Sequence, residues 1–121
     1  GLSPGVYHYN CKNHTVRMVM EGQQRKELGD AALKQKSLLT APVALIVTGV
    51  IERAAEKYGD RALQYTYIEA GCICQNVYLQ CESLGLGIVV MGAFYDDKVI
   101  DLLSLDKSVY TPLIIMPVGN V

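Results

Sequence analysis

A long apolar segment near the middle of the chain constrains the fold more than any other part of the sequence. It runs from about Arg61 to Leu84, follows the helix-breaking pair Gly59-Asp60, and leads through Gly85-Leu86-Gly87 into the apolar stretch Ile88–Met91. Its apolar residues recur every three or four positions and also cover most of the other sides, which indicates a helix. A helix that is apolar nearly all round is expected to be buried on several sides. We therefore expect this helix at the centre of the domain or of a subunit interface.

The length and charge of the chain indicate one small domain without a nucleic-acid-binding signature. The 121 residues match the usual size of a single domain, and the net charge is −1, from 11 basic and 12 acidic side chains. No basic stripe is present, so we expect no nucleic-acid partner. The longest apolar run, about ten residues, is too short to span a bilayer, so we expect no membrane partner either. The beginning of the chain lacks the pattern of a secretory signal, which favours the cytoplasm.

Four cysteines raise the question of a disulfide or a metal site. They are Cys11, Cys72, Cys74 and Cys81, and the last three fall within the predicted long helix. Cys74 and Cys81 lie about two helical turns apart, which is too far for a disulfide. We expect all four to be small buried hydrophobic residues of a cytoplasmic protein, and we expect no metal site.

The rest of the sequence alternates between strand and helix patterns. Val43–Val47 is a continuous apolar run, which is typical of a strand covered on both faces. Asp96 or Asp97 is expected to cap a helix. The expected elements are a β-hairpin over 6–20, helices over 23–36, 51–58, 61–84 and 97–103, and strands over 43–47, 88–91 and 112–116. This order, ββαβααβαβ, predicts an α+β domain with a mixed sheet flanked by helices.

Several short motifs occur in a fixed order and together cover essentially the whole chain. They are GLSPGVYHYN, AALKQKSLLTAPVALIVTG, KYGDRALQYTYIEAG, QNVYLQCESLGLG, MGAFYDD and PLIIMPVG. The set resembles the nitroreductase superfamily, most of all its SagB-type, azoline-dehydrogenase-like branch. The resemblance implies an FMN-dependent oxidoreductase that works as a homodimer on a small-molecule substrate, with NADH or NADPH as a possible reductant. The flavin would lie across the subunit interface.

Five residues acquire expected roles from this resemblance. The main chain at Met91, Gly92 and Ala93 would lie against the isoalloxazine ring, where small residues allow close approach. Lys57 and Tyr58 precede a Gly-Asp-Arg turn, as a catalytic pair does in the azoline-dehydrogenase branch, and one of them would remove a proton from the substrate. From the residues alone, an ordinary glycine at a strand end and a solvated lysine at a helix end remain open alternatives.

The sequence also departs from the family pattern. Cys72 stands where this branch often has a histidine. The family's domain begins with an arginine-rich helix that holds the FMN phosphate, and the arginines of this chain do not match those positions. They are Arg17, Arg25, Arg53 and Arg61. We therefore expect a single domain, 1–121, that lacks the N-terminal part of the fold. A non-catalytic remnant, acting as a dimeric structural or small-molecule-binding protein, remains the alternative function, and the substrate is not identified by the sequence.

Overall fold

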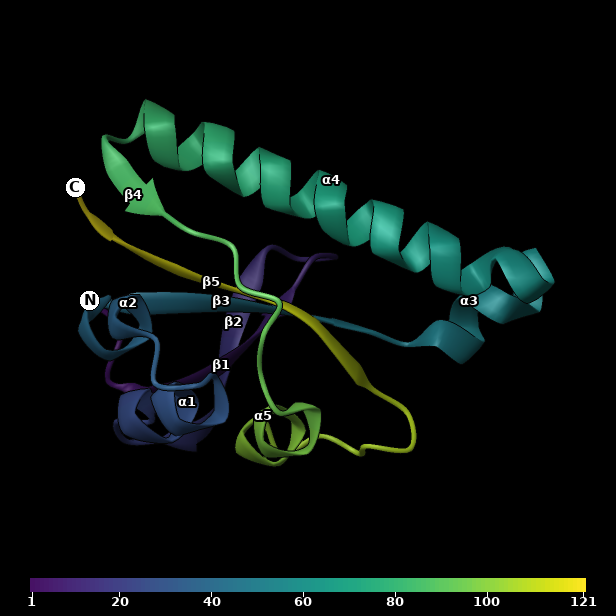
Figure 1. The fold of residues 1–121 in the computed structure, drawn as a ribbon, viewed down its shortest axis with the longest axis horizontal. Coiled ribbons are helices and arrows are strands. Elements are labelled where there is room, and N and C mark those ends of the chain that lie inside the picture. Colours follow the sequence, from purple (N-terminus) through teal and green to yellow (C-terminus); the bar gives the residue numbers. More distant parts are fainter.

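The computed structural model describes residues 1–121 and has a three-stranded β-sheet flanked by helices (Figure 1) and a separate two-stranded sheet. The expected α+β class is therefore confirmed. In chain order the elements are β1 (Gly5–Asn10), β2 (Thr15–Glu21), α1 (Arg25–Ala31), α2 (Lys36–Thr40), β3 (Val43–Gly49), α3 (Ile51–Tyr58), a 3₁₀ turn (Gly59–Arg61), α4 (Ala62–Ser83), β4 (Leu86–Ile88), α5 (Asp96–Leu102) and β5 (Thr111–Asn120).

The main sheet has the strand order β3-β5-β4, with β5 in the middle. Ile115 of β5 lies opposite Ile46 of β3, and Val118 lies opposite Ile88 of β4. Both pairings are antiparallel, so the expectation of a mixed sheet is wrong for this chain. The last strand of the chain, β5, inserts between β3 and β4 and runs antiparallel to both. The two strands that share a direction, β3 and β4, are therefore not neighbours.

Helix α4 covers one face of this sheet, as Figure 1 shows. Its expected limits are confirmed to within a residue at each end, because Gly59 and Gly85 adopt positive φ angles on either side of it. The expectation that the helix is buried on several sides is not met within one chain. Only Ala62, Thr66, Ala70 and Cys81 are buried along it, and Ile68 remains 53% exposed. The outward side of α4 is thus apolar and uncovered.

The hydrophobic core lies on the opposite face of the sheet, where α1, α2 and α5 pack (Figure 1). Its central side chains come from these helices, from β5 and from the segment after β4. They are Leu28, Ala31, Ala32, Leu38, Met91, Val99 and Ile115. Burying seven such side chains, each worth up to about 1.5–3 kcal/mol when large, stabilises this side of the sheet. The chain therefore has three layers, with α4 on one side of the sheet and the shorter helices on the other.

Several predicted boundaries differ from the structure. The helix expected over 23–36 is two short helices, because Leu33 and Lys34 adopt φ angles of 58° and 57° between them. The strand expected over 88–91 lies earlier, in β4, and the last strand continues through Pro117, which lies opposite Ala44. Val43 at the start of β3 is exposed, so that strand is not covered on both faces within one chain.

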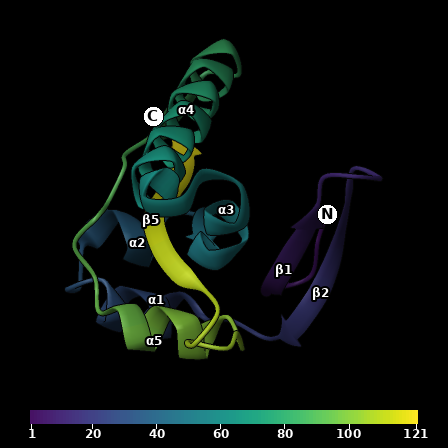
Figure 2. The same ribbon diagram turned by 90° about the vertical axis from the view of Figure 1, so that its right-hand side faces the viewer.

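The hairpin β1–β2 confirms the pattern expected over 6–20, and it stands apart from the remaining elements (Figure 2). A hydrogen bond from the Gly22 N–H to the Pro4 carbonyl closes its base at 2.9 Å. Near its tip, the Tyr9 hydroxyl lies 2.8 Å from Nδ1 of His14, and both side chains are exposed. The two histidines of the chain, His8 and His14, therefore lie on this hairpin.

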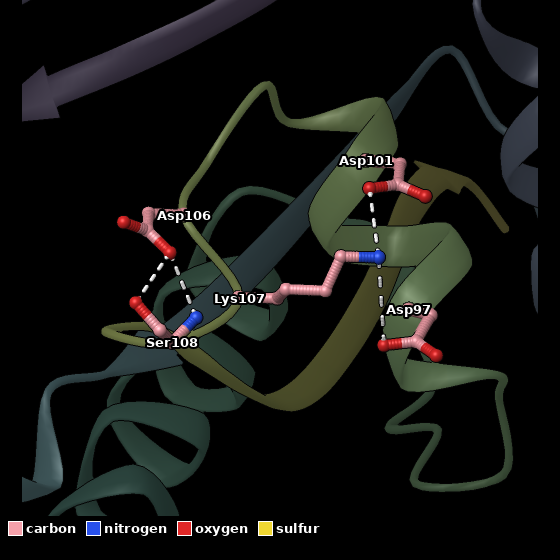
Figure 3. A network of polar contacts seen from close by, with 5 residues as sticks. All are labelled: Asp97, Asp101, Asp106, Lys107 and Ser108. Carbon is pink, nitrogen blue, oxygen red and sulfur yellow. Dashed lines mark hydrogen bonds and ion pairs between the residues drawn. The ribbon is translucent and has the colours of Figure 1, made fainter.

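Charged side chains organise α5 and the loop that leads to β5 (Figure 3). The Lys107 ammonium lies 3.5 Å from Asp101 and 3.9 Å from Asp97, which are one turn apart on α5. Ser108 donates two hydrogen bonds to the Asp106 carboxylate, one from its hydroxyl and one from its main-chain N–H. These bonds, the hydroxyl's first, hold the pKa of Asp106 below its ordinary value. The expected side-chain cap is absent, because Asp97 lies in the first turn of α5, and no side chain bonds the helix N-terminus.

Candidate functional site

The segment that follows β4 contains the three residues expected to contact a flavin. Met91 forms an isolated bridge with Ile115: its N–H donates to the Ile115 carbonyl at 2.8 Å, and its own carbonyl accepts from the Ile115 N–H at 2.9 Å. The Met91 side chain is 5% exposed and belongs to the core. Met91 therefore fastens the segment to the middle strand of the sheet, and its main-chain groups are already paired.

Unlike Met91, Gly92 and Ala93 expose unpaired main-chain N–H groups. Both residues are exposed, and neither N–H donates a hydrogen bond within the chain. A Cβ atom added to Gly92 would meet no heavy atom within 4 Å. An exposed stretch of main chain with free N–H groups and no side chain at its centre can approach a flat, hydrogen-bond-accepting ring. These residues therefore fit the ring part of a flavin.

Two side chains that the sequence did not single out hold this segment from either side. The hydroxyl oxygen of Tyr78 on α4 accepts a hydrogen bond from the Val90 N–H at 3.0 Å. The side-chain amide of Gln35, just before α2, donates to the Ala93 carbonyl at 3.3 Å. Gln35 and Ala93 are 58 residues apart, so no local sequence signal could have linked them. The exposed segment is thus anchored to two different layers.

Lys57 and Tyr58 lie at the C-terminal end of α3. The Lys57 ammonium is 5.2 Å from the centre of the Tyr58 ring, and that ring meets the Tyr65 ring edge-on at 4.9 Å. Lys57 and Tyr58 are both exposed. Figures 1 and 2 both show the end of α3 well away from the segment between β4 and α5. A single chain therefore does not bring this pair to Gly92.

Within one chain, no arginine or metal-ligating cluster lies in the segment between β4 and α5. Arg61 bonds Gln64 at 2.8 Å beside α3, and no arginine occurs between β4 and α5. All four cysteines are free, but only Cys81 is buried, so the expectation that all are buried is wrong for Cys11 and Cys72, which are exposed. No group of three His, Cys, Asp or Glu side chains is arranged to hold a metal ion. No helix combines the length and apolarity needed to cross a membrane.

Several known proteins are similar to this chain in sequence or in fold. MJ1384, a nitroreductase homologue of Methanocaldococcus jannaschii, is 41% identical over 120 residues, which are 99% of this chain and 59% of that protein. A nitroreductase homologue of Anabaena variabilis has a crystal structure that superposes with a TM-score of 0.92 at 30% identity, over 97% of this chain and 24% of that one. The Escherichia coli microcin B17-processing protein McbC is 25% identical over 96% of this chain and 43% of its own length.

The microcin synthetase McbBCD complex, solved with truncated pro-MccB17 bound, also contains a chain of this fold. It superposes with a TM-score of 0.86 at 25% identity, over 95% of this chain and 44% of that one. This chain thus spans little more than half the length of MJ1384 and less than half of the McbBCD chain. Residues 8–120 match the nitroreductase family as a whole. The chain therefore belongs to the nitroreductase family.

Proposed function

We propose that this chain carries the ring-binding part of an FMN-dependent oxidoreductase, which transfers hydride between a reduced nicotinamide or an organic substrate and the flavin. The observation that carries the proposal is the exposed main chain at Gly92 and Ala93, whose N–H groups are free while the residues around them are anchored. FMN, when bound, would supply the ring that accepts and donates hydride. The residues of this chain would position that ring and stabilise negative charge on it.

A homodimer is part of the proposal, and the surface of the chain supports it. The accessible surface is 8203 Å² for a mass of 13.3 kDa. A folded monomer of that mass exposes about 6,500 Å², so roughly 1,700 Å² is in excess. Permanent dimers bury about 1,000–2,500 Å² on each partner, which matches the excess. The exposed apolar side of α4 contributes to this surface, so we propose it as the centre of the dimer interface.

Within such a dimer, Lys57 and Tyr58 of one subunit would serve the flavin held against Gly92 of the other. The support is their position: they lie beside the start of α4 but away from Gly92 of their own chain. When hydride leaves a substrate for the flavin, a base must take the substrate's proton, and either the neutral amine of Lys57 or the phenolate of Tyr58 would do so. This arrangement makes each site incomplete without the partner copy.

Mixed dimers test that arrangement. One subunit would carry Lys57→Ala and the other Gly92→Val, and each variant alone is expected to be inactive. If the pair acts across the interface, the mixture regains activity, because each mixed dimer has one site with both groups intact. If the mixture stays inactive while both variants still dimerise, the assignment across the interface is wrong. Full activity of Lys57→Ala alone would remove Lys57 from the mechanism.

The flavin itself is tested by titrating the purified chain with FMN and then mixing it anaerobically with NADH or NADPH. We expect a yellow complex with a shifted flavin spectrum, which bleaches when a nicotinamide donates hydride. The relative MJ1384 is longer than this chain, so the same titration on MJ1384 gives a matched comparison. If this chain is colourless and does not bind added FMN, the proposal is contradicted and a non-catalytic member of the fold is favoured.

A further inference from the structure

We propose that Gln35 is a positioning residue that aims the main-chain N–H of Phe94 at the flavin ring. The inference rests on the proposed function, and it assigns a role to a side chain outside the segment itself. Gln35 is half-buried, between the two left-handed residues that follow α1 and the first turn of α2. Its side chain reaches across to the segment between β4 and α5.

The amide of Gln35 is used in one orientation only. Its nitrogen donates to the Ala32 carbonyl at 3.2 Å and to the Ala93 carbonyl at 3.3 Å. Because both partners are acceptors, only the NH₂ end of the side chain can face them. A glutamate of the same shape would place an oxygen against two carbonyl oxygens. The site therefore discriminates between two side chains that differ by one group.

Holding the Ala93 carbonyl also orients the next N–H group. No peptide bond in the chain is cis, and in a planar trans peptide the carbonyl and the N–H point in opposite directions. With its carbonyl turned toward Gln35, the peptide between Ala93 and Phe94 must direct the Phe94 N–H away from Gln35. This N–H has no acceptor within the chain.

The same geometry applies one step earlier in the segment. The Met91 carbonyl accepts from Ile115, so the Gly92 N–H, in the same peptide plane, points away from β5. The segment thus carries two free donors whose directions are set by bonds made on the other side of their peptide planes. One depends on the sheet, and the other depends on Gln35. Donors fixed in this way stabilise developing negative charge without reorganising first.

The test compares Gln35→Glu with the matched control Gln23→Glu, an exposed glutamine just before α1 that makes no side-chain hydrogen bond. In the flavin-free chain, ¹⁵N relaxation would measure the order parameter of the Phe94 amide. We expect it to fall from about 0.85 toward 0.6 in Gln35→Glu and to stay unchanged in the control. An unchanged Phe94 amide in Gln35→Glu would overturn the inference.

A second measurement separates positioning from a general loss of stability. We expect Gln35→Glu to weaken the binding of reduced FMN more than that of oxidised FMN, by a further factor of about 2 to 10, the worth of one hydrogen bond. Gln35→Met, which lacks both the donor and the charge, should show the same preference, so a new negative charge is not its cause. Equal weakening of both redox forms overturns this inference alone, whereas absence of FMN binding by the unaltered protein overturns the proposed function.

Discussion

Replacing Ile68 by aspartate is expected to dissociate the proposed dimer while leaving the fold of each chain intact. Ile68 lies two residues after the buried Thr66 on α4, about 200° further round the helix, and so faces away from the sheet. It is 53% exposed in the single chain. The other half of its surface contacts its own chain, so the substitution also costs each folded chain about 0.7–1.4 kcal/mol, which a urea unfolding measurement on the monomer records separately. A loss of association larger than this cost therefore arises from contact with a second copy.

The size of the effect follows from that exposure. Complete burial of an isoleucine is worth about 1.5–3 kcal/mol, so covering the exposed half of Ile68 contributes about 0.8–1.6 kcal/mol per subunit. A symmetric dimer counts this twice, because each copy contributes its own Ile68. The aspartate adds the cost of removing a carboxylate from water, which is several kcal/mol for each ion. We therefore expect the dimer dissociation constant to rise at least about 100-fold.

Sedimentation equilibrium over a range of concentrations measures this constant directly. The matched control is Leu33→Asp, which alters a side chain of nearly equal exposure, 52%, in the connection between α1 and α2. That connection lies on the other side of the sheet from α4 (Figure 1). The control should stay dimeric. A monomeric unaltered chain, or an Ile68→Asp variant that dimerises as tightly as the unaltered chain, would refute the assignment of α4 to the interface.

The remaining predictions concern the site, the sheet and the loop before β5. Gly92→Ala should raise the FMN dissociation constant at least about tenfold without lowering the free energy of unfolding, since its Cβ enters open space. Gly49→Ala should lower the free energy of unfolding in urea and leave the FMN dissociation constant unchanged, because its Cβ would lie 2.9 Å from the Thr66 side chain. Ser108→Ala should raise the pKa of Asp106 in a ¹³C NMR titration, because the largest cause of its lowered pKa is lost. The stability that this lowered pKa contributes is present above the ordinary carboxyl pKa and is lost as the pH falls through the folded-state value.

The parts of the fold that sequence predicts well are those with local causes. Helices α3 and α4 begin and end close to the expected residues, because glycines with positive φ separate them from their neighbours. The hairpin β1–β2 also follows from alternating side chains around a turn. By contrast, the break between α1 and α2 occurs at Leu33 and Lys34, two residue types that rarely adopt left-handed backbone. The residue types at these two positions therefore did not predict the break.

The candidate site shows the same division. Gly92 and Ala93 stand out in the sequence through a motif, and their exposure with free N–H groups agrees with the role that the resemblance implies. Gln35 does not stand out, because its role depends on a contact made across 58 residues. The roles of Lys57 and Tyr58 stay predictions, because one chain keeps them away from the segment that they would serve.

The sequence by itself determined the α+β class, the long apolar helix and the family, since these depend on periodicity, breakers and short motifs. Only the tertiary structure decided that the helix covers one face of an antiparallel sheet and leaves its other side bare. Strand order and the burial of side chains depend on which distant segments pack together, and the periodicity of the sequence does not predict that packing. The same packing decided which peptide groups after β4 are paired and which remain free to meet a ligand.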